Sequence, residues 1–176
     1  TMSSNSVTTS TDVLGNSTIS HSDTTYIYRQ VGKLLVYGQV ITKTWSEGTD
    51  LYGGSWESKG YIMTQRYREA KESFVRSDGK VVQAYLYDIA ITMILSTGAL
   101  AAPMTFNPFE SRFLSWDTAK LQGNQFAFPT FSTGTDIFGN ETTTIATQSM
   151  TIYKGKLITM SSNSVTTSTD VLGNST

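Results

Sequence analysis

The sequence predicts an all-β protein, either a β-sandwich or a jelly-roll-like domain, with at most one short helix. Serine and threonine together make up more than a quarter of the chain, and both are disfavoured inside helices. The motif Thr-Asp-x-x-Gly-Asn recurs along the chain and predicts strands that stop at glycine-containing turns. The first eighteen residues also return unchanged at the end, so one predicted strand is supplied twice.

The repeat divides the chain into three segments. A terminal strand segment covers residues 1–18, a β domain covers residues 19–158, and residues 159–176 repeat the first segment without change. A weaker copy at residues 135–142 matches residues 11–18, with Ile and Phe at the Val and Leu positions and Glu141 in place of Ser17. The segment is therefore predicted to be a recurring β unit, and we expect it to be shared between subunits or between successive repeats.

Each copy is predicted to form one strand, over residues 6–14 in the first, with a break at Gly15 and Asn16. Alternate side chains of an extended strand share a face, so they can meet a neighbouring unit together. Because both copies suit one structural position, we expect only one of them to pair within a given body. The predicted strand-sharing residues are Val7, Thr9, Thr11, Val13 and Leu14 in the first copy and Val165, Val171 and Leu172 in the second.

Composition excludes several classes of partner. The formal net charge is −1 and the 13 basic residues are scattered, so we expect no nucleic-acid partner. No apolar run is long enough to span a bilayer, and we expect no membrane insertion. Cysteine is absent, which excludes disulfides, thiolate zinc sites and thiol nucleophiles.

Catalytic groups are sparse, so we expect a protein that is not an enzyme and has no catalytic residues, metal site or cofactor. The single histidine, His21, has Asp23 two residues away, and in a serine-rich chain a Ser-His-Asp combination carries little information. Carboxylate pairs such as Glu110 and Asp117 occur in any domain with 14 acidic residues. The common nucleotide-binding and metal-binding motifs are missing.

Aromatic residues mark the candidate ligand-binding region. Residues 26–41 predict a hairpin or one long bent strand, and the glycine-rich residues 42–60 predict an exposed loop. Within that loop Trp45, Tyr52 and Trp56 are candidate ligand-binding residues, because exposed rings can stack on sugars or contact a receptor. The alternative is that the three rings cap the end of a β-sandwich.

The middle of the chain contains the predicted core. Residues 61–75 favour either a short helix or two strands, and Asp78-Gly79 then predicts a tight hairpin turn. Residues 80–95 are apolar on both faces of an extended strand, which predicts a central strand covered on both sides. The aromatic-rich residues 106–131 predict the inner face of a second sheet or a surface that meets another subunit.

Two families resemble this chain. The Thr-Asp-x-x-Gly-Asn units and the phrase from Tyr28 to Gly38 (YRQVGKLLVYG) are similar to the shaft and tip domains of phage tail fibres. The duplicated terminal strand resembles the donor-strand arrangement of fimbrial (pilus) subunits, in which a terminal extension of one subunit completes its neighbour. Both resemblances imply an extracellular protein that assembles through β-strands.

We therefore expect a non-enzymatic structural subunit of an extracellular filament, assembled by strand sharing and available for adhesion through its aromatic loop. Its main partner is a second copy of itself in a head-to-tail polymer, on a cell or virion surface. The alternative is a phage tail-fibre or receptor-binding domain, which would be trimeric and bind a host receptor or glycan. A carbohydrate-binding or hydrolytic domain is the third class, and acidic residues clustered beside Trp45 and Trp56 would favour it.

Overall fold

The computed structural model describes residues 1–75, 81–106, 125–153 and 156–175, and in them the predicted all-β class is confirmed. No helix occurs in these ranges, so none there is long and apolar enough to cross a membrane. The strands are β1 (Met2–Thr11), β2 (Ser17–Val31), β3 (Leu34–Thr49), β4 (Ser55–Val75), β5 (Val81–Met93), β6 (Met104–Phe106), β7 (Gln125–Thr135), β8 (Glu141–Tyr153) and β9 (Lys156–Thr169).

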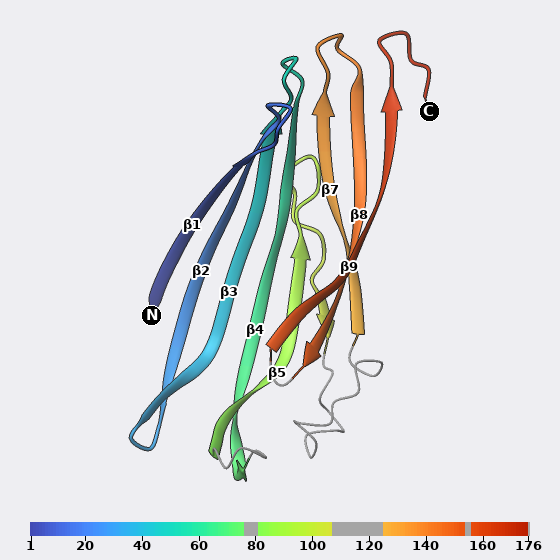
Figure 1. The fold of residues 1–176 in the computed structure, drawn as a ribbon. Coiled ribbons are helices and arrows are strands. Elements are labelled where there is room, and N and C mark those ends of the chain that lie inside the picture. Colours follow the sequence, from blue (N-terminus) through green and yellow to red (C-terminus); the bar gives the residue numbers. More distant parts are fainter. Residues whose placement is uncertain (76–80, 107–124, 154–155, 176) are drawn as a thin grey trace.

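The strands form one antiparallel sheet in the order β1-β2-β3-β4-β7-β8-β9, with β5 paired to β4 and β6 paired to β5 (Figure 1). Neighbours along the chain pair as hairpins wherever the connecting turn is short. Of the two alternatives predicted for residues 26–41 the hairpin is confirmed, because β2 and β3 pair around a turn at Gly32, whose φ is 59°. The two copies of the repeated segment supply β1 and most of β9, the outermost strands of this path.

Strand β4 changes its partner along its length. Residues 55–58 pair with β7, whereas the strand from Tyr61 onward pairs with β5. Gly60 lies between these two stretches with a φ of 72°, and its carbonyl accepts the N–H of Ile94 at 3.2 Å. The register between β3 and β4 also shifts here. The sheet therefore forks at Gly60, and β7 and β8 pack over β4 and β5.

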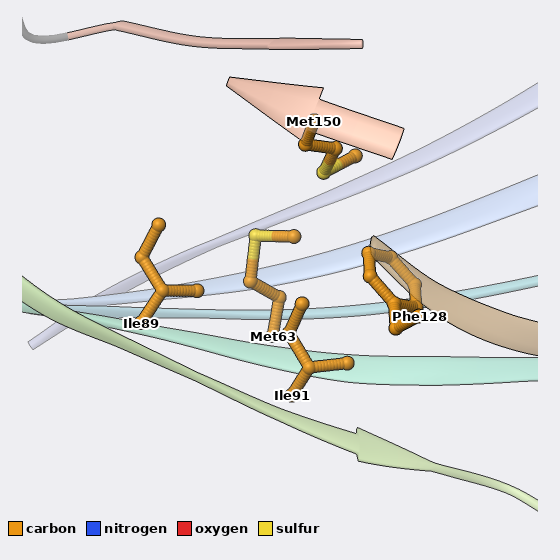
Figure 2. Close-up of a cluster of buried hydrophobic side chains, with 5 residues drawn as sticks. All are labelled: Met63, Ile89, Ile91, Phe128 and Met150. Carbon is orange, nitrogen blue, oxygen red and sulfur yellow. The ribbon is translucent and has the colours of Figure 1, made fainter. Parts of the chain in front are cut away.

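The hydrophobic core fills the space inside this fork. Figure 2 shows five side chains that point toward one another from four strands, namely Met63, Ile89, Ile91, Phe128 and Met150. Ile89 and Ile91 are fully buried, so β5 is a core strand as predicted, but it is not central, since it branches from the main strand order and pairs with β4 and the three-residue β6. The ring of Tyr61 meets Phe128 edge-on, with 4.9 Å between the ring centroids. This cluster joins the two arms of the fork.

Two predictions about local structure are wrong. Residues 61–75 form neither a helix nor two strands, because they are the second part of the single strand β4. The helical pattern lacked a continuous apolar stripe, and the alternation of Tyr61 and Met63 buries one face of a strand instead. Residues 42–60 are mostly strand rather than loop, because β3 runs to Thr49 and β4 starts at Ser55.

Several predictions fall on residues outside the described ranges. They include the Asp78-Gly79 turn and the carboxylates Glu110 and Asp117. Most of the aromatic-rich stretch also lies there, and of its seven phenylalanine and tryptophan residues only the side chains of Phe128 and Phe131 are described.

Candidate functional site at the two sheet edges

Near one end of the sheet, directly paired residues of neighbouring strands form continuous rows. These rows cross seven strands. One such row contains Thr8, Ser20, Ser46, Ser58, Ser132, Thr144 and Thr166. Its first and last members are the same residue of the repeated segment, because Thr8 recurs 158 positions later as Thr166. Directly paired residues point to the same face of a sheet. The two copies therefore run in the same direction, lie at the same height and present the same face.

The three adjacent rows behave in the same way. They begin at Thr9, Ser10 and Thr11 in β1, and they end in β9 at the corresponding copies Thr167, Ser168 and Thr169. The equivalence of the two copies is therefore a property of the whole strand end and not of one residue pair.

The two copies pair through opposite edges. Strand β1 pairs with β2, which follows it in the chain, whereas β9 pairs with β8, which precedes it. Because the copies face the same way, β9 leaves open most of the edge through which β1 binds β2, and at its end Thr169 pairs there with Ser175. Strand β1 likewise leaves open the edge through which β9 binds β8. Our expectation that only one copy pairs within the body is wrong, because the sheet has two outer edges and each copy covers one.

Main-chain hydrogen bonds hold β1 in place, because every residue of that strand is exposed. Val7 is 56% exposed and its copy Val165 is 72% exposed, so neither buries its side chain in the body. Thr9 and Thr11 share the face of Val7 by the alternation of an extended strand. A few polar side chains add cross-strand bonds, among them Asn5 to Asp23 and Thr144 to Thr166. Edge strands of this kind expose unpaired N–H and C=O groups to any further strand.

Four turns with one hydrogen-bond pattern stand at the same end of the sheet, at the top of Figure 1. We call residues 12–16, 50–54, 136–140 and 170–174 the Asp turns. In each, the first residue is an aspartate whose Oδ1 accepts the N–H groups of the third and fifth residues. The fourth residue is a glycine at positive φ, and its N–H donates to the aspartate carbonyl.

Two features of these turns differ from the predictions. The second Asp turn was not predicted, since residues 50–54 end in Gly54 where the others have asparagine, although Thr-Asp-x-x-Gly was a sufficient signal. The predicted strand-sharing residues Val13, Leu14, Val171 and Leu172 lie in turns and not in strands, because the aspartate captures the N–H groups that a strand would use. Their side chains are each at least 67% exposed.

Asparagine side chains link consecutive Asp turns. Asn16 Oδ1 accepts the N–H of Leu51 at 3.2 Å, and Asn140 Oδ1 accepts the N–H of Val171 at 3.3 Å. Gly54 has no side chain with which to extend the series to the third turn. Asn174 ends the fourth turn and repeats the position of Asn16, with its Nδ2 donating to Asp170 as Asn16 donates to Asp12.

The Asp turns lower the pKa of three carboxylates. For Asp12 and Asp170 the largest cause is the hydrogen bond from the side chain of the following asparagine, and backbone N–H donors add to it. For Asp136 desolvation acts most strongly and raises the pKa, but hydrogen bonds from Asn140, Phe138 and Gly139 together outweigh it. The charged form of each aspartate is therefore the form that its turn stabilises.

Acidification is expected to loosen the Asp turns. A folded-state pKa below the unfolded value of about 3.9 means that each aspartate stabilises the fold above that pH and loses its contribution as pH falls through the folded value. The thermal midpoint should therefore fall between about pH 5 and about pH 3, and Asp136→Asn should make this fall smaller. A circular-dichroism melt of both proteins at each pH measures the effect, and equal slopes would contradict the assignment.

The structure does not bring Trp45, Tyr52 and Trp56 together. Trp45 stacks on His21 with centroids 4.8 Å apart, and the Lys43 ammonium lies 5.0 Å from the Trp45 ring. Trp56 pairs with Gly48, three residues from Trp45 in β3, so the two tryptophans point to opposite faces of the sheet. Tyr52 sits at a turn tip and is 76% exposed. The predicted aromatic patch is not formed by these residues.

A different aromatic cluster is formed at the far end of β2 and β3. Tyr26, Tyr28 and Tyr37 lie with ring centroids 5.2 to 6.3 Å apart, and Tyr67 of β4 joins them at 5.8 Å from Tyr37. Desolvation and the neighbouring tyrosines raise the pKa of Tyr28 and of Tyr67. The signal in the sequence was Tyr-Ile-Tyr in β2, whose alternate rings share one face.

A polar groove of about 660 Å³ crosses the sheet below the Asp turns. Glu47, Glu57 and Glu141 line it together with threonine and serine residues. Glu47 Oε1 lies 3.7 Å from His21 Nε2, and Glu57 Oε1 lies 2.7 Å from Lys59 Nζ. Within the described ranges no three His, Asp or Glu side chains are arranged to hold a metal ion.

Comparison of the chain with protein-family models, with curated proteins and with solved structures gives no match. The two sheet edges are therefore the candidate site on the strength of their geometry.

Proposed function

We propose that this protein is a non-enzymatic structural subunit of an extracellular filament, in which neighbouring units share β-strands through the repeated segment. One observation carries the proposal. Strands from the two copies cover both outer edges of the sheet in the same direction, with four residues of each on shared rows, and each copy leaves open most of the edge that the other one uses. A single copy can thus pair with β8 of one unit and with β2 of the next.

Strand addition suits a structural role. Backbone hydrogen bonds between an edge strand and an added strand supply affinity, and alternate side chains fix the register. Pairing an edge also prevents indiscriminate association with other chains. The exposed serine and threonine side chains of β1 and β9 let the segment lie in the interior of a sheet whose two faces meet water. A cell surface or a virion surface is the setting that the resemblances to fimbrial subunits and tail fibres imply.

The test removes one copy of the segment. A chain that lacks residues 159–176, the C-shortened chain, exposes the edge of β8 and keeps β1 paired to β2. We expect β1 of one molecule to fill the edge of β8 in another, so that the C-shortened chain forms linear head-to-tail filaments. Native mass spectrometry and negative-stain imaging report the assembly.

Two controls separate strand sharing from unspecific aggregation. A chain that lacks both residues 1–16 and residues 159–176 has open edges but no segment to share, and it should not form linear filaments. A synthetic peptide of residues 1–18 should stop the growth of the C-shortened chain, whereas a scrambled peptide should not. A C-shortened chain that keeps its fold and stays monomeric at high concentration would contradict the proposal.

A further inference from the structure

We infer that the two copies block assembly of the intact chain, because they cover β2 and β8 of the same molecule. The joint between units forms only where one copy pairs with β8 of one molecule and with β2 of the next. This inference rests on the proposed function and adds to it the partner strand, the register and the regulation of the joint. The partner is a second copy of this chain, since the open edge of β9 is chemically identical to the edge of β1 that binds β2.

A count of strand pairings explains the regulation. Two intact molecules already contain the pairings β1-β2 and β9-β8 at the edges that would meet. In a joint where one copy lies between β8 of one molecule and β2 of the next, the other copy must leave, and no pairing is gained. A molecule that lacks one copy gains a ladder when the joint forms, and the β1–β2 ladder of the intact chain, with ten paired residues, shows its extent. The intact chain therefore already has β2 and β8 covered by its own segments.

The register of the joint follows from the register of β1. In the present structure Ser6 pairs with Ser22, Val7 with His21 and Asn5 with Asp23. The copies of the first two residues in β9 are Ser164 and Val165. In the joint, Ser164 of one molecule therefore lies opposite Ser22 of the next, and Val165 lies opposite His21. This register extends the four shared rows, in which Thr8 to Thr11 correspond to Thr166 to Thr169, without a shift of either strand.

The Asp turns continue across such a joint. Asn16 Oδ1 accepts the N–H of Leu51 at 3.2 Å within the molecule. Asn174 holds the equivalent position in the second copy, and its Nδ2 bonds to Asp170 at 2.8 Å as Asn16 bonds to Asp12. Once β9 lies beside β2 of the next molecule, Asn174 Oδ1 faces the N–H of that molecule's Leu51. The joint thus reproduces a contact that already exists rather than requiring a new one.

The experiment uses engineered cysteines, which are unambiguous here because the chain has none. The N-shortened chain lacks residues 1–16, so the edge of β2 is open and β9 remains on β8. Ser22→Cys with Ser164→Cys, and separately His21→Cys with Val165→Cys, place the two cysteines opposite each other across the joint. Neighbouring pairs of an antiparallel ladder alternate in spacing, so one of the two pairs has the short separation that a disulfide needs. We expect a reductant-sensitive ladder of crosslinked oligomers from that pair.

The matched control moves one cysteine four residues out of register. Ser22→Cys with Ser168→Cys in the N-shortened chain should give the same polymers by native mass spectrometry but no crosslinked ladder. Polymers that crosslink through the control pair, or through neither in-register pair, would overturn the inferred register while strand sharing stands. An N-shortened chain that folds and stays monomeric would overturn the proposed function itself.

The intact chain, studied under the same conditions, tests whether its own segments block assembly. It should stay monomeric over the time in which the N-shortened chain polymerises, because its joint gains no pairing. Adding the peptide of residues 1–18 to the N-shortened chain should restore the monomer. Filaments that grow equally fast from the intact chain would overturn the inference that its segments block assembly and leave the proposed function in place.

Discussion

Replacing Gly60 with alanine is expected to cost at least about 3 kcal/mol of unfolding free energy, because steric overlap adds to backbone strain at this position. An added Cβ at Gly60 would stand 1.6 Å from the carbonyl oxygen of Thr44, which is backbone and cannot rotate away. The φ of 72° is also unfavourable for any residue with a side chain. Strands β3 and β4 would have to separate at the place where the sheet forks. Urea denaturation followed by circular dichroism measures the loss.

Gly98→Ala is the matched control for the fork glycine. Its φ of 84° imposes a similar backbone strain, but no atom lies within 4 Å of an added Cβ. The control should therefore lose only about 1–2 kcal/mol, the strain of the left-handed conformation alone. Equal losses at the two positions would show that the close approach of Thr44 does not decide the stability of the fork.

Phe128→Ala is expected to destabilise the protein by about 3–5 kcal/mol, the usual effect of removing a large buried aromatic ring. Phe128 is 1% exposed and comes from β7, whereas Met63, Ile89 and Ile91 come from β4 and β5. Its ring therefore fills the space between the two arms of the fork (Figure 2). Chemical denaturation gives the change in unfolding free energy.

Phe138→Ala serves as the control for ring removal. Phe138 is 74% exposed at the tip of the third Asp turn, so its replacement should change the unfolding free energy by less than about 0.5 kcal/mol. A loss at Phe138 as large as that at Phe128 would mean that the turn tips, and not the interior of the fork, stabilise the sheet.

Local chemistry made much of the fold predictable. Residues 80–95 are apolar on both faces, which is the pattern of a covered strand, and Ile89 and Ile91 of β5 are indeed buried. Asp-x-x-Gly-Asn predicts a turn because the aspartate can capture backbone N–H groups and glycine can adopt a positive φ. The exact repeat of eighteen residues was enough to predict a strand at each end of the chain.

Long-range pairing was not predictable from the sequence. The fork depends on Ser58 pairing with Ser132, and no local pattern in either strand indicates so distant a partner. The glycines of residues 42–60 suggested a loop. Gly48 instead lies in a strand, where the Trp56 ring packs against it and its Nε1 would stand only 2.4 Å from an added Cβ. The candidate site depends in the same way on register, since only the seven-strand rows show that the two copies leave opposite edges open.

The complete exposure of β1 gives the sheet a gradient of local stability. Opening free energies within one protein range from near zero at fraying segments up to the global value in the core. Strand β1 buries no side chain, whereas β4, β5, β7 and β8 each contribute to the buried cluster. Amide protons of β1 should therefore exchange with solvent through frequent local opening, and those of Met63 and Ile91 only when the fork itself comes apart. The body of the molecule can stay folded while β1 detaches from β2 and pairs with it again.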